Sequence, residues 1–337
     1  MTTLTFHTYP LPYAAAAASA TAAALSSSTP PIPHLIVAAQ GEDSDDDGFD
    51  PNFFDQDYSI AAQTAFSVWE GAAFLLQFLQ RTHSQGQGVS VAASLRQLLR
   101  LDDPSASDRH RTRVVELGSG TGAAGIGLAM LGAEVLCTDI KSVTGNICDN
   151  IQRNASSAAG VSHDATADWL GDMATHVGHG YAAAQPLNWM VPLTSQRTPL
   201  DPCSARVVLA TETTWLRELV EPFVGCASEL LASAYPSPPS STPTPPLAEV
   251  DHDSMPQITR HLLTAQPDRK FLLWVYKERG TEASQTFTTW PLVKSEFERR
   301  GCRVVTVHRE QSGEDEGQWV RVNVVVKSQD GDDQVQW

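Results

Sequence analysis

The chain has 337 residues, of which 42% are hydrophobic, so it is long and apolar enough to bury the core of one large domain or of two small ones. Its formal net charge is −16, and the excess is uneven, because residues 42–57 hold eight acids and no base. The chain contains no run of basic residues, which argues against a nucleic-acid substrate, and its five cysteines form no C-x-x-C pair, which fits reduced thiols and gives no metal site.

Residues 1–60 are expected to form an N-terminal extension. It holds a β-like segment, LTFHTY, an Ala/Ser low-complexity stretch, an apolar segment, HLIVAAQ, and the acidic linker. No Lys or Arg precedes Arg81, so the basic start of a signal peptide and the arginines of a transit peptide are both missing. No apolar run approaches the ~20 residues that a membrane span needs. We therefore expect a cytoplasmic protein, with the nucleus as a further location, that has no membrane partner.

Residues 61–328 are expected to form one domain, followed by an acidic tail, 329–337. Residues 64–82 have the apolar spacing of an amphipathic helix. From residue 113 onward, strand-like runs alternate with helical ones. The predicted strands are 113–117, 134–139, about 185–190, 206–211, 270–276, 302–308 and 319–327, and the predicted helices are 123–132, 141–154, 216–234, 256–266 and 287–300.

This alternation predicts an α/β fold, namely a Rossmann-like, seven-stranded, mostly parallel sheet with helices on both faces. The last two strands are joined by an acidic turn and are expected to pair as an antiparallel hairpin at one edge. Two further stretches, 155–184 and 235–253, are rich in Ala and Gly or in Pro and Ser and are long for simple connections. We interpret both as insertions at the surface.

The stretch VVELGSGTG, residues 114–122, places three glycines on a strand-to-helix turn. Such a turn lets a ligand approach the main chain closely, and an ordinary tight turn or a dinucleotide site are the alternatives. Glu116 favours a ligand with a cationic amino group over a pyrophosphate, which its charge would repel. Asp139 ends the next strand, where a carboxylate accepts both hydroxyls of a ribose. A ligand with a cationic amino-acid end, a ribose and no phosphate is S-adenosylmethionine.

With these motifs the chain resembles the seven-β-strand S-adenosylmethionine-dependent methyltransferases, and within them the protein-lysine methyltransferase-like group, methyltransferase family 16. The matching stretches lie in the family's order over roughly residues 66–327. They are VWEGAAFLLQFL, VVELGSGTGAAGIGLAMLGAEVLCTDI, NIQRN, LNW, VVLATETTWLRELVEPF and YKERG.

The resemblance implies roles for single residues. Trp69 would help to close the cofactor pocket, although a core aromatic on an amphipathic helix is an equal alternative. Glu116, Gly118, Gly120 and Gly122 would hold the methionine part, Asp139 the ribose, and Trp189 would stack beside the adenine. Asn150 and Asn154 of NIQRN are expected only to shape the end of a helix.

The chain departs from the family where Asp-x-x-Tyr usually ends the fourth strand, because here the residues are Glu212, Thr213, Thr214 and Trp215. The change keeps the charge and an aromatic face but loses the phenol. The resemblance implies methylation of a lysine in a protein substrate, with the amine entering past Glu212 and Trp215, by a monomeric enzyme. The alternatives are methylation of a histidine or a small amine, and a non-catalytic binding module with the same fold.

Overall fold

The computed structural model describes residues 4–11, 34–40, 64–81, 89–101, 111–156, 169–234, 256–266, 268–279, 284–313 and 317–329. The acidic linker, the predicted insertion 235–253 and the acidic tail beyond residue 329 lie outside these ranges. The strands are β1 (Leu4–Pro10), β2 (His34–Gln40), β3 (Arg113–Leu117), β4 (Glu134–Asp139), β5 (Thr175–Val177), β6 (Gly180–Pro186), β7 (Val207–Thr211), β8 (Phe271–Lys277), β9 (Cys302–Gln311) and β10 (Trp319–Lys327). The α-helices are α3 (Glu70–Leu79), α4 (Val89–Leu98), α5 (Ala123–Met130), α6 (Lys141–Arg153), α7 (Arg217–Ala232), α8 (Gln257–Thr264) and α9 (Trp290–Arg299).

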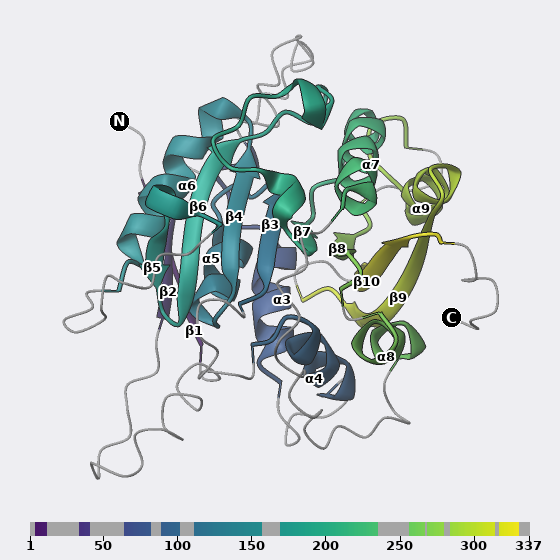
Figure 1. Cartoon of the computed structure of the whole chain (residues 1–337), viewed down its shortest axis with the longest axis horizontal. Helices are drawn as coiled ribbons and strands as arrows, with labels where there is room; N and C mark the ends of the chain where they lie inside the picture. Colours follow the sequence, from purple (N-terminus) through teal and green to yellow (C-terminus); the bar gives the residue numbers. More distant parts are fainter. Residues whose placement is uncertain are drawn as a thin grey trace.

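The central sheet has the strand order β5-β6-β4-β3-β7-β8-β10-β9 (Figure 1). Its five middle strands, β6, β4, β3, β7 and β8, run parallel to one another. β10 is antiparallel to both β8 and β9, as predicted for the last two strands. The α/β fold with a mostly parallel sheet is therefore confirmed.

The sheet has eight strands instead of the predicted seven, and both of its edges are antiparallel. The additional strand, β5, pairs antiparallel with β6 through three residues. The strand expected at about 185–190 lies earlier, at Gly180–Pro186, and both strands take residues from the range interpreted as the first insertion. β6 is rich in alanine and almost wholly buried beside β4. Small side chains let it lie in the sheet without the β-branched residues that usually mark a strand.

Helices cover both faces of the sheet. Neighbouring residues of a strand point to opposite faces, so they belong to two different core clusters. Val114 belongs to the core cluster that includes side chains of α3, α4, α5, α6 and α8. Val115, the next residue, belongs to the cluster under α7 and α9. In Figure 1 α5 and α6 lie behind the strands β4 and β6. None of the helices in the described ranges is long and apolar enough to cross a membrane.

The N-terminal strands β1 and β2 form a separate antiparallel pair outside the central sheet. β2 packs against α5 and α6. Leu35 and Val37 of β2 are fully buried and join the same core cluster as α5 and α6. These two strands, which lie in the predicted extension, thus share their core with the domain.

Two helical glycines are in opposite situations and predict opposite effects of the same substitution. A Cβ on Gly127 of α5 would lie 2.4 Å from Leu76 Cδ2 of α3, whereas a Cβ on Gly145 of α6 meets nothing within 4 Å. We expect Gly127→Ala to lower the free energy of unfolding by about 1–3 kcal/mol through overpacking. Gly145→Ala should raise it by about 0.5–1 kcal/mol, because alanine loses less backbone entropy on folding. Urea denaturation of both variants measures this; a neutral Gly127→Ala would contradict the close packing of α3 on α5.

Candidate functional site

A pocket lies where the parallel strands of the sheet end. The segments that follow β3, β4, β6 and β7 line it, together with the segment that leads into α3. β3 lies between β4 and β7 in the sheet. The chain leaves β3 toward β4 on one side and later returns to β7 on the other side, so the connections after neighbouring strands run in opposite directions at this point. In open parallel sheets, ligands bind at this kind of divergence, at the carboxyl ends of the strands.

Seven of the nine predicted site residues line this pocket. They are Trp69, Gly118, Gly120, Asp139, Trp189, Glu212 and Trp215. The structure therefore brings together residues that are up to 146 positions apart in the printed sequence. Glu116 and Gly122 are not among the residues that line the pocket.

The first two glycines of the turn have conformations and surroundings that exclude other residues. Gly118 and Gly120 have φ angles of 65° and 55°, in the left-handed region that favours glycine. A Cβ on Gly118 would lie 2.8 Å from a methyl group of Thr213 and 2.9 Å from the ring of Trp189, and one on Gly120 would lie 2.9 Å from a backbone oxygen of Ala65. Glycine is needed at both positions, because neighbouring residues occupy the space that a side chain would take.

Gly122 serves the helix instead. It is the N-cap of α5 with a φ of 79°, and a Cβ there would lie 3.1 Å from both Ile126 and Ile147. Gly122 therefore allows α5 and α6 to pack closely and does not line the pocket.

Asp139 is held by two backbone amides at the end of β4. Its Oδ2 accepts a hydrogen bond from Gly120 N at 2.8 Å, and its Oδ1 accepts one from Ile140 N at 2.7 Å. A carboxylate has about four acceptor positions, so each oxygen can still accept a hydrogen bond from a ligand. Burial raises the pKa of Asp139 from 3.8 to about 6, although the two amide donors oppose this shift.

Two polar atoms at the pocket have no hydrogen-bond partner among the described residues. They are the indole nitrogen of Trp189 and the hydroxyl of Thr213. Buried polar groups without partners are rare in folded proteins, and each is costly. Both side chains line the pocket, so a bound molecule can supply the missing partners.

Glu116 points away from the pocket, into the packing between β3 and α5. Its side chain accepts a hydrogen bond from Gly125 N at 3.2 Å, and only 1% of the residue is exposed. Burial raises its pKa from 4.5 to about 7. A Cβ on Gly125 would lie 2.5 Å from Glu116 Oε2, so this glycine makes room for the carboxyl group. Glu116 is therefore not among the residues that line the pocket, and its contact with the methionine part of a ligand, direct or through water, stays a prediction.

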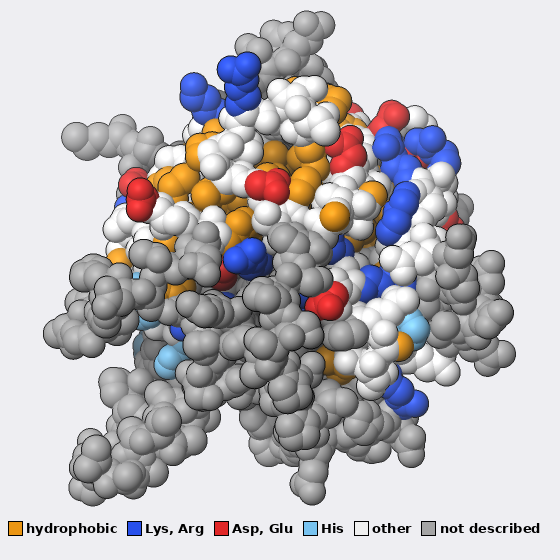
Figure 2. All heavy atoms as spheres, in the orientation of Figure 1, with side chains coloured by type: hydrophobic (Ala, Val, Ile, Leu, Met, Phe, Trp, Pro, Cys, Tyr) orange, Lys and Arg blue, Asp and Glu red, His pale blue; other side chains and the backbone are white. Residues whose placement is uncertain are grey.

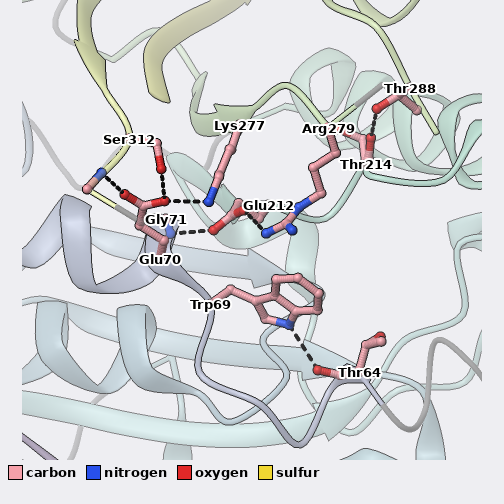
Figure 3. A network of polar contacts seen from close by, with 11 residues as sticks. Thr64, Trp69, Glu70, Gly71, Glu212, Thr214, Lys277, Arg279, Thr288 and Ser312 are labelled. Atoms are coloured by element: carbon pink, nitrogen blue, oxygen red, sulfur yellow. Dashed lines mark hydrogen bonds and ion pairs between the residues drawn. The ribbon is translucent and has the colours of Figure 1, made fainter. Parts of the chain in front are cut away.

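The other end of the pocket is lined by two tryptophans, and the guanidinium of Arg279 lies against one of them, Trp69 (Figure 3). The rings of Trp69 and Trp215 stack with their centroids 6.0 Å apart. The guanidinium of Arg279, two residues after β8, lies 4.4 Å from the centroid of Trp69. Its Nη2 is 2.6 Å from Oε1 of Glu212. Arg279 carries no motif of its own in the sequence, and only its place after β8, in YKERG, could have pointed to it.

Glu212 is the acidic residue of the variant motif, and the protein's own donors occupy both of its oxygens. Arg279 binds Oε1, and the amide of Gly71 at the start of α3 donates to Oε2. Glu212 has a φ of 52°, unusual for a residue other than glycine and typical of strained positions at functional sites. A Cβ on Gly71 would lie 2.8 Å from the Glu212 side chain, so only glycine allows this approach.

Glu70, the residue before Gly71, fixes the same end of α3 a second time. Its carboxylate lies 2.5 Å from Nζ of the fully buried Lys277 side chain and accepts hydrogen bonds from Ser312 and Gly313 (Figure 3). Trp69 directly precedes this pair, and its indole nitrogen donates to the backbone oxygen of Thr64 at 2.9 Å. These contacts place Trp69 over the pocket.

Comparison with family models identifies the family of this chain. The family model described as lysine methyltransferase matches residues 54–235, just over half of the chain. Among solved structures, the magnesium protoporphyrin IX methyltransferase of Synechocystis with bound S-adenosylhomocysteine is 11% identical, with a TM-score of 0.35, over 75% of this chain and 92% of that one. An O-methyltransferase family protein of Burkholderia thailandensis is 8% identical, with a TM-score of 0.37, over 75% of this chain and 62% of that one.

Because the carboxyl group of Glu116 is buried, we expect the difference in unfolding free energy between the ligand-free wild type and Glu116→Gln to depend on pH. Its raised pKa means that the folded state favours the protonated form, so its contribution is fully present below pH 4.5 and is lost as the pH rises through about 7. Glu116→Gln removes this titration. Relative to the wild type, the variant should gain up to about 3 kcal/mol between pH 5 and pH 8. Urea denaturation at both pH values measures the gain, and a difference that does not change with pH would contradict it.

Proposed function

The chain belongs to the lysine methyltransferase family, and we propose that it transfers a methyl group from S-adenosylmethionine to a lysine side chain of a protein. One observation carries the proposal: the pocket at the glycine turn continues to the aromatic pair Trp69 and Trp215, and the guanidinium of Arg279 lies over the ring of Trp69. The two halves of the pocket match a nucleoside-bearing cofactor and a cationic acceptor.

The residues at the glycine turn fit the cofactor. Asp139 keeps acceptor positions for the two ribose hydroxyls, and Gly118 and Gly120 line the pocket beside it. The unpartnered indole nitrogen of Trp189 and hydroxyl of Thr213 would be satisfied by polar groups of the bound molecule. When bound, S-adenosylmethionine supplies a methyl group on a sulfonium, whose sulfur keeps the electron pair of the broken bond.

The aromatic end fits the acceptor. A guanidinium over the face of Trp69 supports the view that this wall attracts cations, as aromatic faces do. Trp215 stacks on Trp69 and lines the pocket, so it would hold the alkyl stem and amine of an incoming lysine. Packed rings also keep water away from the amine, which has to lose a proton before its lone pair can attack.

Glu212 would act on the acceptor through charge without being a free base. Both oxygens are engaged by Gly71 and Arg279, so a lysine ammonium that approaches the pair competes with Arg279 for the carboxylate. In this proposal Glu212 and Arg279 set the charge of the entrance, and the two tryptophans set its shape.

The surface supports a protein as the acceptor over a nucleic acid. On the face shown in Figure 2, the Lys and Arg side chains lie in separate small groups with Asp and Glu side chains between them. The chain as a whole carries a net charge of −16. Binding to a phosphate backbone usually relies on a continuous basic patch.

A labelling experiment tests the proposed reaction. The purified protein is incubated with a cell lysate and S-adenosylmethionine that carries a labelled methyl group, and the labelled material is analysed by mass spectrometry. We expect methyl groups on the side-chain nitrogen of lysine in one protein or a few. Label on histidine or in a small amine would replace lysine as the acceptor. Binding of S-adenosylhomocysteine without any transfer would favour a non-catalytic role.

The raised pKa of Asp139 predicts that cofactor affinity depends on pH. The carboxylate accepts the ribose hydroxyls, so binding must expel the proton that Asp139 holds below pH 6. The dissociation constant of S-adenosylhomocysteine should be flat above about pH 7 and rise by up to about tenfold per pH unit below pH 6. Asp139→Asn should bind more weakly and without this slope in calorimetry. A slope that persists in Asp139→Asn would assign the proton to another group.

Trp215 is the residue whose change should separate transfer from cofactor binding. Trp215→Ala opens the acceptor end to water, and we expect the transfer rate to fall by about tenfold or more while the affinity for S-adenosylhomocysteine stays within about threefold. Trp215→Tyr keeps an aromatic face and should keep transfer. Phe287→Ala is the matched control, because Phe287 packs on Trp215 with centroids 6.2 Å apart but does not line the pocket. Transfer at the wild-type rate by Trp215→Ala would place the acceptor elsewhere.

A further inference from the structure

Two asparagines of α6 bind the outer edge of β2. Asn150 Oδ1 accepts from Ala38 N at 2.9 Å, and Asn150 Nδ2 donates to Ala38 O at 3.2 Å. One turn later, Asn154 Oδ1 accepts from Ile36 N at 2.8 Å, and Asn154 Nδ2 donates to Ile36 O at 2.6 Å. These residues therefore do more than shape the helix end, which is all that the sequence led us to expect of them.

The spacing of the two elements explains this match. Alternate residues of a strand direct their N–H and C=O groups to the same edge, and two such residues are about 6.6–6.8 Å apart. Residues four apart on a helix lie on one face at a rise of about 6 Å. A side-chain amide has an NH₂ group that donates and an oxygen that accepts, like the N–H and C=O groups of a strand residue. The pair Asn150 and Asn154 thus binds β2 as a neighbouring strand would.

The two asparagines differ in a third contact. Asn150 is fully buried, and its second amide hydrogen is donated to the backbone oxygen of Thr121 at 2.8 Å. Thr121 belongs to the glycine turn and lines the pocket. The second amide hydrogen of Asn154 goes instead to Asn150 O at 2.8 Å, within its own helix. Only Asn150 therefore connects β2 with the turn.

All hydrogen-bonding positions of the Asn150 amide are in use. Besides Ala38 and Thr121, it accepts a hydrogen bond from Arg153 at 3.0 Å. A buried amide with four hydrogen bonds has one orientation, because any rotation would leave a buried group without its hydrogen bond. The position of the Thr121 carbonyl is thereby tied to the position of β2.

We propose that Asn150 is a positioning residue for the cofactor site, which fixes the glycine turn against the N-terminal strand pair β1 and β2. The strand pair is then a working part of the methyltransferase domain, although it lies in the segment predicted to be an N-terminal extension. The inference rests on the cofactor half of the proposed function and not on the identity of the acceptor.

Matched substitutions in the full chain test this role. Asn150→Leu and Asn154→Leu each remove one step of the contact with β2, but only the first removes the contact with Thr121. We expect both to lower the melting temperature. The dissociation constant of S-adenosylhomocysteine should rise by about tenfold in Asn150→Leu, as for the loss of one buried hydrogen bond at a site, and stay within about threefold in Asn154→Leu.

Amide hydrogen exchange separates a positioning role from a general loss of stability, because only the former affects the glycine turn selectively. Amides of residues 118–123 should exchange faster in Asn150→Leu than in Asn154→Leu, whereas amides of β2 should exchange faster in both. If Asn150→Leu does not fold, Asn150→Ala and Asn154→Ala decide by the same measurements. Equal cofactor affinities in the two folded variants, or equal exchange at the turn, would overturn the inference. A wild-type protein that does not bind S-adenosylhomocysteine would overturn the proposed function as well.

Discussion

The arrangement of the pocket depends on two charged contacts at the start of α3. Glu70 binds the buried Lys277, and the amide of the next residue, Gly71, binds Glu212. Lys277 ends β8 and Glu212 follows β7, so these contacts fasten the segment before the first parallel strand to the carboxyl ends of two later ones. The Lys277 side chain is fully buried while Glu70 is partly exposed, and loss of the carboxylate from beside a buried ammonium is destabilising, so this junction is well defined.

Glu212 belongs to the variant motif, and its carboxylate is bound by residues of the protein itself. Its carboxylate is nearly enclosed, with 1% of the side chain exposed, and both oxygens are bound by the chain itself. Its left-handed backbone is compatible with a site in which the surrounding contacts fix an unfavourable conformation. These hydrogen bonds join the start of α3 to the ends of β7 and β8, and they thereby position Trp69 and Trp215 at the pocket.

The sequence predicted those parts of the fold and the pocket that depend on local patterns. The glycine turn, β3, β4 and Asp139 follow from residues close together in the chain, and the structure places the turn and Asp139 side by side. β5 was missed because three residues give no periodic signal, and β6 because its alanines lack the usual strand residues. The pairing of Arg279 with Glu212 joins residues 67 positions apart, so no local pattern could announce it. The burial of Glu116 could have been predicted from its position. It lies two residues after Val114 in the strand, so both side chains are on the face that α5 covers.

The asparagine pair on α6 also bears on how this chain behaves among other copies of itself. The outer edge of a strand is a template on which another chain can add a strand, and uncovered edges promote aggregation. At Ile36 and Ala38, side-chain amides of Asn154 and Asn150 occupy that edge. A helix thereby caps the strand pair along this side, and β2 is kept from serving as the seed of an intermolecular sheet there.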